Sequence, residues 1–190
     1  MTAPKPGSPA SETFEIFEND RVTGELDRRI RETLAVCFPD DAAHFLRDRS
    51  WNSRPAWVVV MRDPDGAVTA HCAMVVRTVM VDGDIPVTVA GVQGFSVLPR
   101  YRGTGLSDRL MERALAEARA RNIEAGLLFC LPALEKVYAR TGWRTLDAVA
   151  AMRGENGESA PIPGKNIVMA IPLSLPAFPA GDIDLMGPDW

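Results

Sequence analysis

The segment of this chain with the clearest chemical meaning is residues 91–106, GVQGFSVLPRYRGTGL, in which an apolar strand leads through a short basic loop into a helix. Such a junction gathers backbone N–H groups at one point, and the helix dipole favours an anion there by about 0.3–1 kcal/mol. Gly103 and Gly105 allow a ligand close to the backbone, and Arg100 and Arg102 add positive charge. The segment therefore predicts a site for a phosphorylated ligand.

The spacing of the glycines in this loop shows which known phosphate-binding motifs it can and cannot be. The chain has no Gly-x-x-x-x-Gly-Lys-Ser/Thr run, and Asp108 stands where a dinucleotide fingerprint needs its third glycine. What remains, Arg100-x-x-Gly103-x-Gly105, resembles the acyl-coenzyme A pyrophosphate loop of the GNAT superfamily of N-acetyltransferases. By itself so short a motif fits an ordinary strand-to-helix turn equally well, so the surrounding elements have to decide.

Hydrophobic periodicity and turn signals predict the order β-α-α-β-β-β-α-β-α-β-β. The expected strands are 13–17, 56–62, 67–81, 85–97, 125–131 and 166–171, the expected helices are 24–37, 39–47, 106–122 and 132–142, and 153–164 is expected to be a polar loop. This α/β (α+β) order, a mixed central sheet flanked by helices, resembles the GNAT fold and puts the glycine loop between the fourth strand and the third helix. We expect one domain over residues 12–190, after a Pro/Ala/Ser-rich tail at 1–11.

The composition of the chain limits the classes of protein to which it can belong. A chain of 190 residues with 46% hydrophobic and 24% charged residues is typical of a globular domain, and a net charge of −4 argues against a general nucleic-acid binder. Cys37, Cys72 and Cys130 lie in apolar stretches as reduced core residues, and His44 and His71 make no metal cluster. With no signal peptide or membrane span in the sequence, we expect a cytoplasmic protein that binds neither metal nor membrane.

The resemblance assigns the cofactor site. Gly91 and Gly94, in an otherwise apolar strand, predict a bulge or a close backbone approach. By position, Phe95, Ser96 and Val97 would contact the pantetheine arm of acetyl-coenzyme A and supply an oxyanion-stabilising N–H. The residues that would hold the pyrophosphate and begin the helix are Arg102, Gly103, Thr104, Gly105 and Leu106.

The resemblance also assigns catalytic groups. Tyr138, in Tyr-Ala-Arg-Thr-Gly-Trp143, matches a family tyrosine whose hydroxyl lies near the thioester sulfur and can protonate the thiolate, although a half-buried helix tyrosine is the alternative. The expected reaction is direct attack of an amine on the thioester, without a covalent enzyme intermediate. Gln93 stands where many relatives carry a basic glutamate; it can orient a water or a substrate hydroxyl but cannot accept the proton.

For the acceptor, residues 50–190 are similar to aminoglycoside 2′-N-acetyltransferases, including the Val92–Val97 segment and the closing Pro188-Asp189-Trp190. Members of that family bind the antibiotic with terminal acidic groups and the carboxylate of the last tryptophan, which implies Asp189 and Trp190 as substrate contacts together with Gln93 and Gly94. Asp182 and Asp184 would add negative charge, unless they belong to an ordinary solvated tail.

Other acceptor residues and other readings stay open. Asp40 and Asp41, between the first two helices, would bind ammonium groups or serve as N-cap residues. Gln93, Phe129 and Lys165 depart from the 2′-acetyltransferases and suggest an unusual aminoglycoside of the kasugamycin type. A nodulation-type N-acyltransferase of another amino sugar, a protein-lysine acetyltransferase and a non-catalytic acyl-coenzyme A sensor are the alternatives; acyl length, the base and a homodimer are undetermined.

Overall fold

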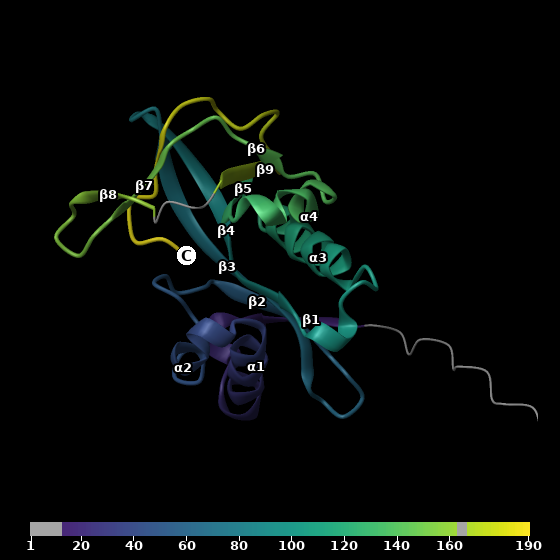
Figure 1. Ribbon diagram of the computed structural model, residues 1–190. Coiled ribbons are helices and arrows are strands. Elements are labelled where there is room, and N and C mark those ends of the chain that lie inside the picture. The colour runs from purple at the N-terminus through teal and green to yellow at the C-terminus, as the bar shows by residue number, and fades with distance from the viewer. Residues whose placement is uncertain (1–12, 163–166) are drawn as a thin grey trace, which may run out of the picture.

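The computed structural model describes residues 13–162 and 167–190, so the tail expected at 1–11 and Lys165 lie outside it (Figure 1). The helices are α1 (Gly24–Cys37), α2 (Ala42–Phe45), α3 (Leu106–Ala120) and α4 (Glu135–Ala139). The strands are β1 (Phe14–Glu18), β2 (Trp57–Arg62), β3 (Val68–Val81), β4 (Ile85–Val97), β5 (Ala125–Cys130), β6 (Arg144–Thr145), β7 (Ala150–Arg153), β8 (Ser159–Pro161), β9 (Ile167–Pro172) and β10 (Ile183–Asp184).

The described strands form one mixed sheet around the long antiparallel hairpin of β3 and β4. The path runs β6-β9-β5-β4-β3-β10-β7-β8, and β2 and β1 extend from the other part of β3. The one β4–β5 contact is parallel and short, pairing Val89–Gly91 with Ala125–Leu127. Beyond Gly91 the two strands diverge, and this divergence opens the centre of the sheet.

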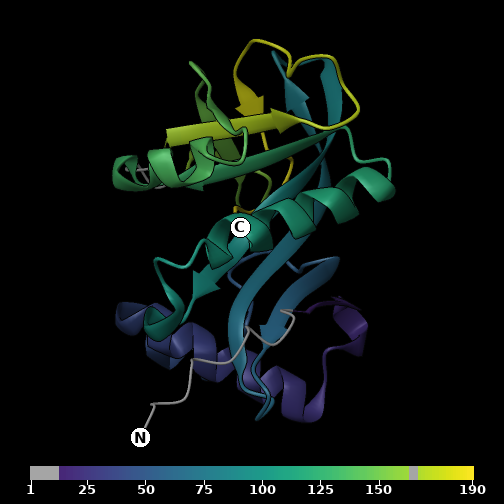
Figure 2. The same cartoon turned by 90° about the vertical axis from the view of Figure 1, so that its right-hand side faces the viewer.

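Helices cover the hairpin from two sides. Figures 1 and 2 show α1 and α2 on one side of β3 and β4, and α3 and α4 on the other. The apolar stripe of α1 buries Ile30 and Leu34 against Val58 and Val60 of β2. The stripe of α3, as its periodicity predicts, buries Leu106, Leu110, Met111, Ala114, Leu115 and Ala118. The single α/β domain expected from the order of elements is confirmed.

The second half of β4 carries a bulge. Gln93 pairs with Ala73 and Ser96 pairs with His71, so Gly94 and Phe95 together oppose the single residue between them on β3. Gly94 has φ +58°, a conformation that favours glycine, and its carbonyl lies 2.9 Å from Nδ1 of His71. The bulge predicted from Gly94 is therefore present, whereas Gly91 serves a different purpose described below.

The structure differs from expectation mainly after α4. The interval 153–164, expected to be a polar loop, contains β8, which pairs with β7 as a short hairpin, and β10 lies between β3 and β7. Strands of two to four residues show no readable alternation, because tertiary pairing rather than local pattern creates them. Helix ends are also shorter than expected: α2 ends at Phe45 and α3 at Ala120.

Within the described ranges, no helix is both long enough and apolar enough to cross a membrane.

Candidate active site

A cavity of about 430 Å³ lies between the end of α1, the bulged half of β4 and α4. Of the predicted cofactor contacts, it brings together Phe95, Ser96, Val97, Arg102 and Tyr138. The remaining wall is formed by Cys37, Phe38, Ser107, Leu134, Val137 and Arg140. The other predicted residues, Gly103–Leu106, do not line the cavity itself but continue from Arg102 along the loop to α3.

The glycine loop is held in a fixed shape at the N-terminus of α3. Gly103 and Gly105 have φ +77° and +75°, and Gly105 is the left-handed residue that precedes the helix. The hydroxyl of Thr104 donates to the Tyr101 carbonyl at 2.8 Å, and Nε of Arg102 donates to the Val97 carbonyl at 3.0 Å. First-turn N–H groups have no partner inside a helix, so this preformed loop suits a diphosphate.

Gly103 gives a first test of the loop. Gly103→Ala is expected to raise the KM for acetyl-coenzyme A about tenfold, because a methyl group intrudes where the backbone must approach the phosphates. Gly83, in the β3–β4 turn, is a matched control: it has φ +85° against +77°, and an added Cβ at either position meets no atom within 4 Å. Both variants should lose similar stability in urea unfolding. Equal effects on the KM would contradict the assignment.

A second cavity, of about 410 Å³, opens on the far side of Phe95 and Tyr138. It shares Phe38, Phe95, Leu134 and Tyr138 with the first, so the two meet where β4 and β5 diverge. Its other lining residues are Asp41, Trp51, Val92, Gln93, Gly94, Leu128, Phe129, Cys130, Leu131 and Trp190. Four of the predicted acceptor contacts thus lie together, and two, Asp40 and Asp189, do not line the cavity.

Tyr138 stands at the junction of the two cavities. Its ring packs against Phe95, with centroids 5.6 Å apart, and edge-on against Trp143 at 6.5 Å. The residue is 8% exposed, and burial raises the pKa of its phenol above the usual value near 10. Tyr138 is therefore a neutral O–H at physiological pH, which can donate a hydrogen bond and is not a phenolate base.

Gln93 presents an oxygen without a partner. Its Nε2 donates to the Ser53 carbonyl at 3.1 Å, which orients the amide, and the residue is 2% exposed. Among the described residues its buried Oε1 has no hydrogen-bond partner. A buried acceptor left unpaired costs free energy, and Gln93 is among the residues that line the second cavity, so an N–H or O–H that reached this oxygen would be favoured.

Two adjacent aspartates at the start of α2 differ in whether they line the second cavity. Asp41 lines the second cavity, and its side chain makes no capping hydrogen bond to α2. Asp41 is thus the N-cap residue of α2 by position, but its carboxylate does not cap the helix. Asp40, one residue earlier in the same 3₁₀ turn, is exposed and is not among the residues that line the cavity.

The acidic groups near the C-terminus are mostly occupied by structural contacts. Asp182 accepts the Val149 N–H at 2.9 Å, and Asp184 pairs with Arg153, whose guanidinium lowers the pKa of that carboxyl. Asp189 accepts a hydrogen bond from Asn52 at 2.6 Å. The expected wall of aspartates near the C-terminus is thus not formed. Among the residues that line the second cavity, the carboxylate side chain is that of Asp41.

Trp190 fills the gap between the diverging strands. An added Cβ on Gly91 would lie 2.2 Å from its indole ring, and its ring centroid is 5.6 Å from that of Phe129. Gly91 is therefore the close approach that its position in β4 predicts, with a side chain rather than a ligand against it. The aromatic neighbours Phe38 and Trp51 were missed by sequence analysis, because nothing in their local pattern points to the site.

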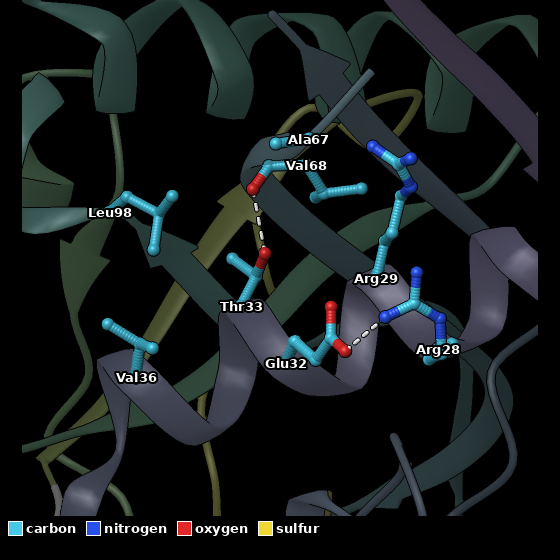
Figure 3. A pocket seen from close by; sticks show the side chains of 8 residues that line it. All are labelled: Arg28, Arg29, Glu32, Thr33, Val36, Ala67, Val68 and Leu98. Atoms are coloured by element: carbon cyan, nitrogen blue, oxygen red, sulfur yellow. Dashed lines mark hydrogen bonds and ion pairs between the residues drawn. The ribbon is translucent and has the colours of Figure 1, made fainter. Parts of the chain in front are cut away.

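A further cavity, of about 370 Å³, lies between α1 and the start of β3 and shares no lining residue with the other two (Figure 3). Arg28 pairs with Glu32 across its mouth, and Thr33 donates to the Val68 carbonyl at 2.7 Å. The rest of the wall shown is largely apolar, from Val36 and Leu98. Its charged groups are all paired, Arg28 with Glu32 and Arg29 with Glu25, so we assign it no reactive group.

Among the described residues, no three His, Cys, Asp or Glu side chains gather in a way that could hold a metal ion.

Comparison with known proteins decides the family. The model of the acetyltransferase (GNAT) domain matches residues 16–146, which include the glycine loop, both cavities' β4 wall and Tyr138. This chain belongs to the GNAT family. It is an N-acetyltransferase domain that uses acetyl-coenzyme A as the acetyl donor. A search of curated proteins finds no significant match.

Solved structures share the fold of this GNAT protein. YhbS from Escherichia coli, a GNAT family N-acetyltransferase in complex with CoA, has a TM-score of 0.66 and 21% identity over 95% of this chain and 93% of its own. A Brucella melitensis GNAT acetyltransferase in complex with acetyl-CoA has 0.55 and 18%, over 90% and 94%. The ribosomal-protein-S18-alanine N-acetyltransferase of E. coli has 0.54 and 15%, over 87% and 97%. At these identities the likeness concerns the fold.

Proposed function

We propose that this protein acetylates an amine of an amino sugar that carries few amino groups, such as an aminoglycoside of the kasugamycin type. The observation that carries the proposal is the wall of the second cavity. Aromatic rings dominate it, from Phe38, Trp51, Phe95, Phe129, Tyr138 and Trp190, and Asp41 contributes its carboxylate. A role in resistance to such an antibiotic would follow from the same activity.

The wall composition favours a particular kind of acceptor. Aromatic faces pack well on the apolar faces of a pyranose ring, and Asp41 can pair with one ammonium group by a charge-assisted hydrogen bond. Further ammonium groups would lie against rings and aliphatic side chains without a carboxylate, and an unpaired charge is costly to desolvate. A sugar with one or two amines therefore suits the cavity better than a polycation.

The first cavity fits the donor. A preformed glycine loop meets the need of a diphosphate, and the space beside the bulge, with the buried hydroxyl of Ser96 in its wall, suits an amide-bearing arm. When bound, acetyl-coenzyme A supplies the thioester carbonyl that an amine attacks. Arg102 and the loop 103–106 would hold its phosphates, and Phe95–Val97 would hold the arm.

Groups of the protein itself would carry out the remaining steps of the reaction. Tyr138 keeps its phenolic proton and can give it to the leaving sulfur. In the bulge, backbone N–H groups released from regular pairing would stabilise the negative charge that develops on the thioester oxygen. Oε1 of Gln93 would accept one N–H of the amine and so orient its lone pair. Asp41 would draw the ammonium in and receive its first proton, directly or through water, and the second proton, lost by the nitrogen as the tetrahedral adduct collapses, would restore the phenol of Tyr138.

Turnover on a panel of amines tests the proposal. The loss of thioester absorbance is followed with kasugamycin, polyamine aminoglycosides, glucosamine oligomers and a lysine peptide. We expect the highest kcat/KM on an amino sugar with few amines. Preference for the peptide would contradict the acceptor assignment, and acetyl-coenzyme A binding without turnover on any amine would favour the sensor.

Asp41 provides a variant test. Asp41→Asn is expected to raise the KM for the amino sugar 10- to 100-fold, because a hydrogen bond to a charged group contributes about 1.5–3 kcal/mol. The KM for acetyl-coenzyme A should not change, since Asp41 does not line the first cavity. Asp40→Asn is the matched control: it removes the same charge one residue away and should leave both KM values unaltered.

A further inference from the structure

The last residues of the chain form a wall of the acceptor cavity. After β10, Leu185–Trp190, here called the C-terminal strap, runs beside β3 to the C mark in Figure 1. Leu185 is buried and its N–H donates to the Ala151 carbonyl at 2.8 Å, which fixes the start of the strap. Its other end, Trp190, reaches the cavity over Gly91.

Arg77 of β3 binds the strap along its length. Its Nη1 donates to the Pro188 carbonyl at 2.6 Å and to the Leu185 carbonyl at 3.3 Å. The guanidinium carbon lies 5.4 Å from the centroid of the Trp190 ring, in cation–π geometry. An added Cβ on Gly187 would meet the guanidinium at 2.9 Å, so the strap is in close contact with it. Arg77 therefore adds side-chain hydrogen bonds to the two backbone bonds that join the strap to β7, from the Leu185 N–H to the Ala151 carbonyl and from the Arg153 N–H to the Gly187 carbonyl.

Ser53 connects the strap to Gln93. Its hydroxyl accepts from Nη2 of Arg77 at 2.9 Å and lies 2.7 Å from the Asp189 carbonyl and 3.1 Å from that of Pro188. The carbonyl of the same residue accepts the Gln93 amide N–H. Ser53 is 4% exposed, so these bonds are made away from water. One residue of the α2–β2 loop thus joins the wall made by the strap to the side chain that faces the acceptor.

We propose that Arg77 and Ser53 are positioning residues for the acceptor site: they hold the C-terminal strap in place, so that Trp190 closes the cavity while Gln93 presents its oxygen to the amine. Neither residue lines either cavity, so both act through Trp190 and Gln93. The strap makes acceptor binding depend on contacts remote from it, and it leaves the donor site unaffected. This inference rests on the proposed function for its kinetic part only.

The test uses Arg77→Met and Ser53→Ala in the full chain. Arg77→Met keeps the length of the side chain and removes its donors, and Ser53→Ala removes the hydroxyl and keeps the carbonyl that orients Gln93. We expect kcat/KM for the amine to fall 10- to 100-fold in Arg77→Met and less in Ser53→Ala, with the Kd of acetyl-coenzyme A unchanged. Because both act through one strap, the double variant should lose less than the product of the single losses.

Arg121→Met is the matched control. Arg121 also lies over a tryptophan, 4.3 Å from the centroid of Trp57, and pairs with Glu18 and Glu117, but it lines neither cavity. It should lower the melting temperature and leave kcat/KM for the amine unchanged. If kcat/KM for the amine fell equally in Arg121→Met and Arg77→Met, the loss would be explained by lower stability alone. That result would overturn the positioning role.

Hydrogen–deuterium exchange of the strap peptide gives a readout independent of activity. Exchange over 185–190 should rise at least tenfold in Arg77→Met and stay at the wild-type level in Arg121→Met. Unchanged exchange in Arg77→Met would overturn the proposal. If exchange rises in Arg77→Met but the wild type acetylates no amino sugar, Arg77 does anchor the strap and the proposed acceptor is wrong. Failure of the anchoring role is thus distinguished from failure of the proposed function.

Discussion

Replacing Tyr138 by phenylalanine is expected to lower kcat by about 10²- to 10³-fold, the range of a lost general acid. The ring would still pack against Phe95 and Trp143, so the fold and the Kd of acetyl-coenzyme A should be preserved. Since burial raises the pKa of this phenol, ionisation of Tyr138 should not reduce the activity of the wild type up to pH 9. Single-turnover rates and equilibrium binding, measured on both proteins, separate the two effects.

The chain's other tyrosine is the control. The hydroxyl of Tyr101 lies 3.4 Å from an Asp63 oxygen and lines neither cavity. Tyr101→Phe should therefore retain wild-type kcat. A kcat for Tyr138→Phe within threefold of wild type would show that the tyrosine only packs, and the proton for the leaving sulfur would have to come from water.

The second large effect concerns stability in acid and comes from His71. Its ring is completely buried behind the bulge, and burial lowers its pKa from the usual 6.5 to about 4. The hydrogen bond to the Gly94 carbonyl opposes this shift, and the charge of Arg49 adds to it. Above pH 6.5 the side chain is neutral in both folded and unfolded chains. Between pH 6.5 and 4 the unfolded chain takes up the proton, so unfolding becomes more favourable as the pH falls.

Integrated over that window, His71 alone should cost about 3 kcal/mol of unfolding free energy, and about 2 kcal/mol by pH 5. Urea unfolding at pH 7.5 and pH 5 measures the loss. His71→Gln, which keeps a donor for the Gly94 carbonyl but does not titrate, should lose that much less between the two pH values. Carboxylates that pair with arginine add losses nearer their own lowered pKa values, in wild type and variant alike. Parallel pH curves for the two proteins would refute the assignment to His71.

Sequence predicted the parts of the site that rest on local backbone chemistry. The glycine loop, the bulge at Gly94 and the two amphipathic helices were correct because glycine conformation and helical periodicity are properties of short segments. The roles of Tyr138 and Gln93 stay predictions, although both side chains do lie where the two cavities meet or beside that point.

What sequence did not predict depends on pairing between distant segments. Arg77 and Ser53 lie in an unremarkable strand and loop, and only the return of the chain more than a hundred residues later gives them partners. Asp40 and Asp41 are indistinguishable in composition, and a 3₁₀ turn decides which one lines the cavity. Gly91 signalled a close approach, but the approaching group, Trp190, is remote in sequence.

Cys37 has a practical consequence for enzymology. It is half-buried in the wall of the donor cavity, whereas Cys72 is completely buried and Cys130 is 4% exposed. Burial raises the pKa of the Cys37 thiol, so it reacts slowly, yet a reagent that titrates released coenzyme A enters the same space. Alkylation there would block the donor cavity irreversibly and lower the concentration of active enzyme, and protection of this one thiol would report occupancy of the donor cavity without any acceptor present.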